Sequence, residues 1–384
     1  MEKFILTPGP VEVSEAVRIA MAKQIVNPDL DPTFFDFYKQ LSQKFQKILH
    51  TKEDVLVLNG EGILGLEAAV VNVVEPGDTV LVLDNGFFGR GFADFVIGCG
   101  GQVVFLSKDY QQAITAEDLR DALIQHPQVK VVTMVHCDTP SGMLNPIQDL
   151  APICREFGKL SIVDAVASMA GEKILMDEWQ IDILIGGSQK ALSAPPGLTI
   201  MGVSEMAWQA MRKRKTPYGG YYLNLLLWKN GWLTHYKEFP YTQPVSDLYA
   251  LDEAVNRVLT EGEDVYTRHR KIACAVRQTL QKAGFQLMPN EDCRAVTVTA
   301  FMVPDHIPDE AFRLKLWKKY GVMIGGSWGS LAGKVWRIGH MGEGAKADKI
   351  YRFFDAFEQA LLDYNVEPYP MAAAFAELYQ MTNL

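Results

Sequence analysis

Short apolar runs alternate with amphipathic helical patterns from residue 55 to residue 187. Strands are predicted at 55–60, 79–86, 102–108, 129–137, 159–167 and 182–187, and helices at 63–74, 88–96 and 150–157. Thr115 and Asp118 have the spacing of a helix-capping pair, so another helix is expected to begin there. The strand segments are apolar almost throughout, which is typical of parallel strands covered on both faces. The alternation predicts a large, doubly wound α/β domain with a mostly parallel sheet of the seven-stranded type.

The pattern changes after about residue 255. Helical periodicity extends through 251–262 and 264–284, strands are predicted at 295–303, 321–326 and 334–340, and helices at 309–319 and 344–363. Strands and helices in this order indicate a smaller C-terminal α+β domain. We therefore predict an N-terminal arm at 1–20, a large domain at 21–255 and a small domain at 256–384.

Composition and charge narrow the class of protein. The chain has 384 residues, of which 48% are hydrophobic and 22% charged, as in an ordinary globular protein. Its net charge of −9 disfavours nucleic acid and anionic membranes as partners. Five widely spaced cysteines without a CxxC predict neither a disulfide framework nor a metal site. No apolar run approaches the roughly 20 residues of a membrane span, so a cytoplasmic protein is expected.

Polar and aromatic side chains stand where several predicted strands end. Asp164 ends one buried strand, Phe88 follows another, and Lys190 lies in a Gly/Pro-rich loop after a third. Ligands of open α/β sheets bind beyond the carboxyl ends of the strands. A lysine amine, a carboxylate and an aromatic ring are what a pyridoxal site requires: a Schiff-base amine, a partner for the pyridine nitrogen and a stacking surface.

The motifs around these residues resemble a known family. They are TPGPVEV (7–13), NGEGILGLEAA (59–69), EPGD (75–78), VDAVAS (163–168), GGSQKALSAPPGL (186–198) and RIGHMG (337–342). In this order they are similar to the class V aminotransferases of the alanine–glyoxylate and serine–pyruvate group, which are fold type I pyridoxal-phosphate enzymes. The resemblance implies small-molecule substrates and a homodimer, or a dimer-based tetramer, with active sites at the subunit interface.

The resemblance also implies roles for individual residues. Lys190 would be the Schiff-base lysine and Asp164 the partner of the pyridine nitrogen, which makes these two residues catalytic. Arg337 would bind the substrate carboxylate. Phe88 would be the stacking ring, and Thr139 would contact the ring substituents. The other cofactor-binding positions would be Glu61, Gly62, Ile63, Gln189 and Thr242.

Two positions differ from the members that bind a phosphorylated cofactor. Those members carry serine or threonine where this chain has Glu61, and some carry tyrosine where it has Phe239. A helix N-terminus normally receives the cofactor phosphate at the first of these places. Two like charges about 4 Å apart repel by roughly 4 kcal/mol at an effective dielectric constant of about 20. Phenylalanine, unlike tyrosine, has no hydroxyl to offer.

These differences resemble the branch of the family that takes free pyridoxamine and pyruvate to pyridoxal and L-alanine, with the unphosphorylated vitamer as substrate. In that branch a second arginine stands at the place of Trp328. The alternative is an ordinary pyridoxal-phosphate aminotransferase acting on alanine or serine and glyoxylate or pyruvate. A nicotinamide dehydrogenase is disfavoured because no GxGxxG follows the first strand.

Several residues have simpler interpretations that the sequence leaves open. Glu61 is also a good helix N-terminal carboxylate facing solvent, and Arg337 would suit a surface ion pair. His136 is interpreted as a packed, hydrogen-bonded histidine rather than a catalytic base. The aromatic segment 217–241 fits a dimer interface or domain packing better than a cofactor site.

Overall fold

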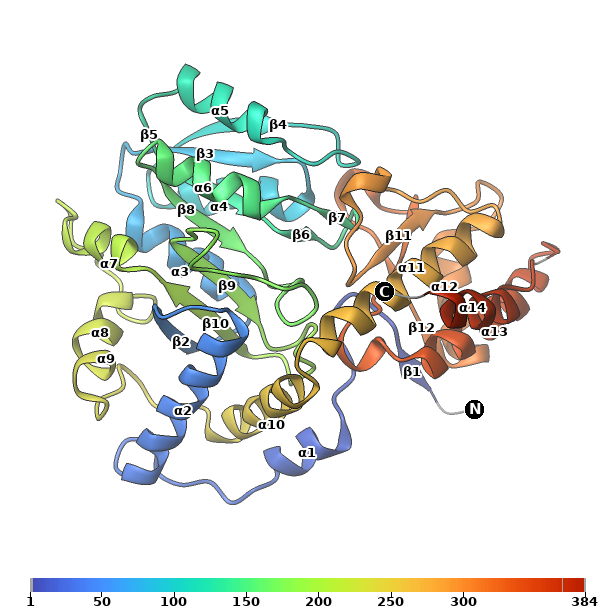
Figure 1. Cartoon of the computed structure of the whole chain (residues 1–384), viewed down its shortest axis with the longest axis horizontal. Helices are drawn as coiled ribbons and strands as arrows, with labels where there is room; N and C mark the ends of the chain where they lie inside the picture. Colours follow the sequence, from blue (N-terminus) through green and yellow to red (C-terminus); the bar gives the residue numbers. More distant parts are fainter. Residues whose placement is uncertain (1–2, 368, 383–384) are drawn as a thin grey trace.

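The computed structural model describes residues 3–367 and 369–382, and its largest element is a seven-stranded sheet (Figure 1). The strand order is β2 (Asp54–Asn59), β10 (Leu198–Val203), β9 (Ile183–Gly187), β8 (Leu160–Asp164), β5 (Val129–Val135), β3 (Thr79–Asp84) and β4 (Gln102–Ser107). Only β10 runs antiparallel to its neighbours in this sheet. The predicted doubly wound, mostly parallel α/β fold is confirmed, and β10 is a strand that the pattern did not predict.

Helices cover both faces of this sheet and close its hydrophobic core. They are α2 (Pro32–Ile48), α3 (Gly62–Val73), α4 (Phe87–Gly98), α5 (Ala116–Gln125), α6 (Ile147–Glu156), α7 (Glu205–Arg212), α8 (Leu225–Asn230), α9 (Trp232–His235) and α10 (Val245–Glu261). The start of α5 is the predicted capping box, in which Thr115 and Asp118 exchange side-chain and backbone hydrogen bonds. Asp31 caps α2, and Pro32 occupies its first turn, where no hydrogen-bonding N–H is needed.

The C-terminal part has a hydrophobic cluster of its own. Its three-stranded sheet has the order β11 (Thr299–Met302), β14 (Val335–Ile338), β13 (Gly325–Gly326), and its helices are α11 (Asp264–Lys282), α12 (Asp309–Tyr320), α13 (Ala347–Leu362) and α14 (Met371–Met381). Phe312 stacks on Trp336 in the centre of this cluster. The proposed division of the chain stays a prediction, and its boundary at 255/256 falls inside α10.

The first residues of the chain join the C-terminal part. Strand β1 (Phe4–Ile5) pairs in parallel with β12 (Val322–Met323), and helix α1 (Glu15–Met21) then leads toward α10. A short hairpin of β6 (Cys137–Asp138) and β7 (Met143–Leu144) follows β5 and meets the C-terminal sheet. A Cβ added at Gly142 in this hairpin would lie 3.0 Å from the Ala300 Cβ. The carboxyl ends of β5, β8 and β9 therefore lie beside both the N-terminal segment and the C-terminal part.

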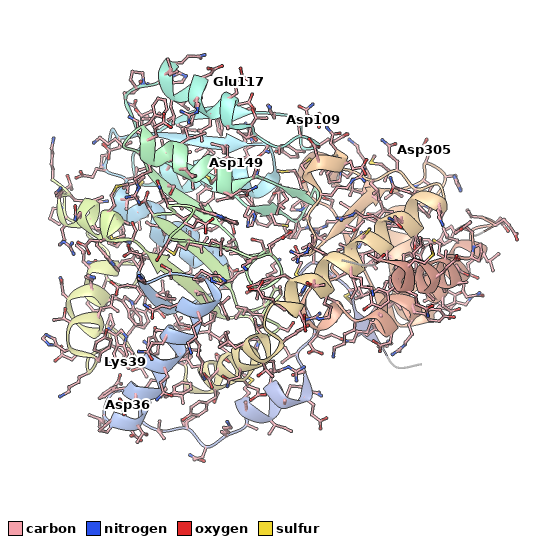
Figure 2. The ribbon with its side chains drawn as sticks, in the orientation of Figure 1. Asp36, Lys39, Asp109, Glu117, Asp149 and Asp305 are labelled. Atoms are coloured by element: carbon pink, nitrogen blue, oxygen red, sulfur yellow. The ribbon has the colours of Figure 1, made fainter. Side chains whose placement is uncertain are left out.

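Acidic side chains are exposed at several places on the molecule. Figure 2 labels six charged side chains, of which the acidic ones, all exposed, are Asp36, Asp109, Glu117, Asp149 and Asp305. Across 3–367 and 369–382, no helix is both long enough and apolar enough to cross a bilayer.

Candidate active site

Lys190 lies directly after β9, beneath the N-terminal segment. Its Nζ donates a hydrogen bond to the Pro8 carbonyl oxygen at 2.7 Å. Gly9 has a φ of +102°, and a Cβ there would lie 2.4 Å from Lys190 Cδ, so only glycine lets this segment pass so close to the lysine. Burial, and then the nearby Arg337 charge, lower the pKa of Lys190 to about 8, while Asp164 acts in the opposite direction.

Asp164 ends β8 with a buried carboxylate that is only half satisfied by the protein. Its Oδ1 accepts the Val166 N–H at 2.8 Å, while Oδ2 has no hydrogen-bond partner in residues 3–367 and 369–382. Burial raises the pKa of this carboxyl to about 7, against the lowering effects of the Val166 N–H and of Lys190. A buried carboxylate with one unbonded oxygen is stabilised when a cationic group of a bound ligand donates a hydrogen bond to that oxygen.

A cavity of about 470 Å³ brings most of the predicted site residues together. Those on its wall are Glu61, Gly62, Ile63, Phe88, Thr139, Asp164, Gln189 and Lys190, and the other lining residues are Gly9, Pro10, Leu66, Cys137, Val166, Ala167, Pro196 and Trp328. The Thr139 hydroxyl has no protein partner within the described ranges, and the buried Gln189 Oε1 has none either. These free polar atoms and the free Asp164 oxygen suit a small polar, aromatic ligand.

Glu61 is the N-cap of α3 at the edge of this cavity. Its Oε1 accepts the Ile63 N–H at 3.1 Å and its Oε2 accepts a hydrogen bond from Gln189 Nε2 at 3.3 Å. The side chain is exposed, as the helix-cap interpretation expects, yet it also forms part of the cavity wall. A carboxylate therefore already uses one of the N–H groups that would otherwise bind an anion at this helix end.

Phe88 is held in place by a residue that the sequence analysis did not single out. The Phe88 N–H donates to Asp138 Oδ1 at 3.0 Å, and Asp138 Oδ2 accepts from the Ser141 hydroxyl at 2.8 Å. Gly86 permits this contact, because a Cβ there would lie 2.4 Å from the Asp138 carboxyl carbon. The signal in the sequence was the DTPSG turn after the strand at 129–137, where an aspartate followed by a serine three residues later favours local capping.

Arg337 lies on β14 beside the cavity and is 4% exposed. Its Nε donates to the Gly326 carbonyl oxygen at 2.5 Å, and its Cζ is 5.0 Å from the centre of the Trp328 ring. No carboxylate in residues 3–367 and 369–382 forms an ion pair with it, which contradicts the surface-pair interpretation. Burial lowers its pKa to about 10. A buried guanidinium without a counter-ion is prepared to receive an anionic group.

Three other residues of interest are not part of the cavity wall. The Thr242 hydroxyl donates to Asp29 Oδ2 at 3.2 Å on an exposed surface, so a single chain does not bring this predicted site residue into the cavity. Phe239 stacks on Trp232 with ring centres 4.3 Å apart, inside an aromatic cluster. His136 is buried and its pKa is lowered to about 4 by burial, so it is neutral and packed, but its Nδ1 lacks the hydrogen bond that we expected.

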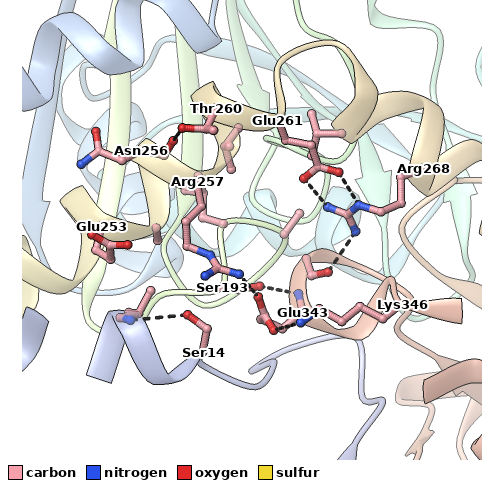
Figure 3. Close-up of a pocket in the computed structure, with 17 residues that line it drawn as sticks. Ser14, Ser193, Glu253, Asn256, Arg257, Thr260, Glu261, Arg268, Glu343 and Lys346 are labelled. Carbon is pink, nitrogen blue, oxygen red and sulfur yellow. Dashed lines mark hydrogen bonds and ion pairs between the residues drawn. The ribbon is translucent and has the colours of Figure 1, made fainter. Parts of the chain in front are cut away.

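A second cavity of similar volume lies on the other side of the lysine loop (Figure 3). There the Glu343 N–H donates to Ser193 Oγ at 2.8 Å, and the Gly342 N–H donates to His269 Nε2 at 2.9 Å. Figure 3 shows Arg268 paired with Glu261 at the wall of this cavity. The contact between Ser193 and Glu343 ties the loop that holds Lys190 to the segment that follows Arg337, and the contact between Gly342 and His269 ties that segment to α11.

Both the sequence and the fold are similar to those of known proteins. The family model for class V aminotransferases matches residues 14–336. This chain belongs to the class V aminotransferases. The resemblance seen in the motifs is thereby confirmed, and the protein is a transaminase of the pyridoxal-phosphate type.

Individual class V aminotransferases are similar over almost the whole chain. The pyridoxamine–pyruvate transaminase of Mesorhizobium japonicum is 36% identical over 89% of this chain and 87% of its own. The alanine–glyoxylate aminotransferase of Felis catus is 32% identical over 94% of this chain and 87% of its own. The crystal structure of pyridoxamine–pyruvate aminotransferase from Mesorhizobium loti matches with a TM-score of 0.94 at 32% identity, covering 99% of this chain and 98% of that one.

Proposed function

We propose that this class V aminotransferase moves the amino group of free pyridoxamine to pyruvate and releases pyridoxal and L-alanine. The observation that carries the proposal is the position of the Glu61 carboxylate. It lies at the cavity wall and accepts the Ile63 N–H at the start of α3, the kind of helix end at which a phosphate ester binds. Similarity to the pyridoxamine–pyruvate transaminase supports the same assignment.

Electrostatics favours a neutral hydroxymethyl group beside Glu61. A phosphate ester there would meet a carboxylate of the same sign, at a cost of roughly 4 kcal/mol for unit charges about 4 Å apart at an effective dielectric constant of about 20. A hydroxyl would instead donate a hydrogen bond to the carboxylate. Gln189 supports this orientation, because its Nε2 donates to Glu61 Oε2.

The remaining cavity residues fit a pyridoxal ring. Phe88 offers a face for stacking, the Thr139 hydroxyl is free to hydrogen-bond a ring substituent, and Asp164 Oδ2 is free to accept from a protonated pyridine nitrogen. When bound, the pyridine ring supplies an electron sink that stabilises negative charge on the carbon that loses its proton.

The chain's own residues supply the binding and the proton transfer. Lys190 has a pKa near 8, so close to neutral pH its amine can both accept and return the proton that moves between C4′ of the vitamer and Cα of the amino acid. Arg337 holds the carboxylate of pyruvate or alanine. The exchange balances: the amino nitrogen passes from pyridoxamine to pyruvate, whose keto oxygen leaves as water, and another water supplies the aldehyde oxygen of pyridoxal. The C4′ carbon loses the two electrons that the keto carbon of pyruvate gains, so no outside oxidant or reductant is needed.

A second copy of the chain is part of this proposal. Thr242 is exposed, and the nearby Tyr221 and Tyr222 are 64% and 43% exposed. We propose that this surface meets its partner in a homodimer or dimer-based tetramer, which would carry Thr242 to the cavity of the other subunit. Location in the cytoplasm also stays a prediction.

Replacing Glu61 by serine tests the vitamer preference directly. The variant loses the repelling charge and keeps a side chain able to cap α3, so affinity for pyridoxal phosphate should rise and affinity for pyridoxal should fall, each by about tenfold, or roughly 1.4 kcal/mol. Both vitamers are titrated into wild type and variant. Glu67→Ser is the matched control, since Glu67 is exposed on the same helix and does not line the cavity.

The alternative function gives a different result. The α3 N-terminus remains at the cavity, and an ordinary aminotransferase would use it for pyridoxal phosphate. Tight binding of pyridoxal phosphate by the wild type, unchanged by Glu61→Ser, would reject our proposal. It would assign the protein to the pyridoxal-phosphate-dependent alanine or serine aminotransferases that use glyoxylate or pyruvate.

Replacing Arg337 by alanine should weaken carboxylate substrates selectively. A charge-assisted pair between guanidinium and carboxylate contributes about 1.5–3 kcal/mol, so KM for pyruvate and alanine should rise by about tenfold or more while Kd for pyridoxamine stays within about twofold. Steady-state kinetics and vitamer titration give the two values. Arg120→Ala, at an exposed arginine paired with Glu156, is the control. Equal losses for both ligands would place Arg337 outside carboxylate binding.

A further inference from the structure

We propose that an aromatic wall selects the amino acceptor. It consists of Phe88 and Trp328, which line the cavity, and of Phe87, which packs against both rings without lining it. The acceptor class that this wall fits is a 2-oxo acid with one carboxylate and an apolar side chain, of which pyruvate is a small member. The inference rests on one part of the proposed function, the binding of the substrate carboxylate by Arg337. It does not depend on whether the vitamer carries a phosphate.

The three rings of the aromatic wall pack edge to face. Trp328 has its ring centre 5.6 Å from that of Phe87 and 5.9 Å from that of Phe88, with interplanar angles of 61° and 75°. Phe87 and Phe88 meet each other at 5.5 Å and 88°. Although held by these contacts, Trp328 is 49% exposed, and it lines the same cavity as Lys190. An apolar group bound in the cavity therefore contacts a rigid aromatic surface, and this contact removes exposed ring area from water.

The backbone around Trp328 holds it at this place. The preceding Ser327 is buried, and its hydroxyl donates to the Pro140 carbonyl oxygen at 2.8 Å. The following Gly329 has a φ of +57° and packs against Phe87, where a Cβ would lie 3.3 Å from the ring. The wall is thus anchored on one side to the hairpin that follows β5 and on the other to the start of α4.

The wall lies next to the group that would receive the acceptor carboxylate. The Arg337 Cζ is 5.0 Å from the centre of the Trp328 ring. A Cβ added at Gly325 would lie 3.5 Å from Arg337 Nε and 3.1 Å from Pro8 Cδ, and the Pro8 carbonyl oxygen accepts the hydrogen bond of Lys190 Nζ at 2.7 Å. The guanidinium and the reacting amine therefore lie on either side of the same N-terminal segment. An acceptor whose carboxylate pairs with Arg337 and whose carbonyl carbon faces Lys190 directs its side chain into the space beside Trp328.

The charges around the cavity disfavour a dicarboxylic acceptor. Of the described residues on its wall, the charged ones are Glu61, Asp164 and Lys190. Asp164 is occupied by the pyridine nitrogen and Lys190 is used in the reaction, so the remaining charge is the Glu61 carboxylate, which repels a second carboxylate. A second carboxylate would also lose water against aromatic rings without gaining a counter-ion. An apolar side chain has neither cost.

The experiment compares acceptors on the purified enzyme carrying its own vitamer. Values of kcat/KM are measured for pyruvate, 4-methyl-2-oxopentanoate, phenylpyruvate and 2-oxoglutarate. Binding of the unreactive acids propionate, 4-methylpentanoate, 3-phenylpropionate and glutarate is measured by calorimetry. For the wild type we expect the two bulky apolar acceptors to be used at least 100-fold better than 2-oxoglutarate, with the unreactive acids ranked in the same order.

Replacing Trp328 by alanine isolates the contribution of the wall. Aromatic contact of this kind predicts that KM for phenylpyruvate and Kd for 3-phenylpropionate rise about tenfold, while the values for pyruvate and propionate change by less than about threefold. Trp328→Phe keeps an aromatic surface and should recover most of the loss. Trp317→Ala, in α12 and not on the cavity wall, is the matched control and should change none of these values.

The outcomes separate this inference from the proposed function. Equal effects of Trp328→Ala on pyruvate and phenylpyruvate, or a wild type that uses 2-oxoglutarate as well as phenylpyruvate, would overturn the role of the wall. A wild type that prefers pyridoxal phosphate but shows the expected acceptor ranking would refute the pyridoxamine proposal alone. Loss of the ranking with pyridoxamine turnover intact would refute the wall alone.

Discussion

Transamination is lost in the Lys190→Ala variant, by at least about 1,000-fold in turnover, because no other amine in the described cavity can bond the vitamer and move the proton. The fold should survive, since the change removes one hydrogen bond to the Pro8 carbonyl and no core volume. Single-turnover kinetics with pyridoxamine and pyruvate, together with thermal unfolding, give the two quantities. Mass spectrometry after borohydride reduction should find the vitamer on Lys190 of the wild type and none on the variant.

The lowered pKa of Lys190 gives this assignment a pH signature. Only the neutral amine attacks an aldehyde, and its fraction rises with pH through about 8 rather than through the ordinary lysine value near 10.4. Capture of pyridoxal by the vitamer-free enzyme should therefore accelerate between about pH 7 and pH 9 and then level off. Lys173→Ala, at an exposed lysine paired with Glu263, should leave the capture rate unchanged. Rapid turnover by Lys190→Ala would remove Lys190 from the chemistry.

The Asp164→Asn variant should bind pyridoxamine with Kd within about threefold of wild type but turn over at least about 100-fold more slowly. The amide oxygen can still accept the Val166 N–H, which preserves the local structure. A neutral amide cannot keep the pyridine nitrogen protonated, because it lacks the charge that favours the cationic form. The comparison of Kd with kcat separates this chemical role from a structural one, which would change both.

Glu172, a carboxyl whose pKa is also raised by burial, serves as the control for Asp164. Burial also raises the pKa of Glu172 to about 7, but this residue does not line the cavity. Glu172→Gln should therefore leave kcat unchanged, whatever its effect on stability. Turnover of Asp164→Asn equal to that of wild type would make Asp164 a structural residue and would leave the pyridine nitrogen without an assigned partner.

Much of the large domain followed from local patterns. The apolar runs predicted six of the strands of the central sheet. Five of them are largely buried, and a strand buried on both faces must be apolar throughout, whereas β4 lies at the sheet edge and is only partly buried. Strand β10 was not predicted, since Leu198–Val203 follows directly on a Pro-Pro-Gly segment that is typical of a loop. Its pairing with both β2 and β9 depends on where those strands lie, and a local pattern contains no information about that.

By itself the sequence determined the class of fold, the family, and the neighbourhood of Lys190, Asp164 and Phe88, because the carboxyl ends of parallel strands meet at one edge of a sheet. Tertiary structure alone decided that Pro8 bonds the lysine amine, that Glu61 shares its carboxylate between Ile63 and Gln189, and that Trp328 faces the cavity. Segments far apart in the chain make these contacts, and only the packing of the complete chain brings them within hydrogen-bonding or van der Waals distance.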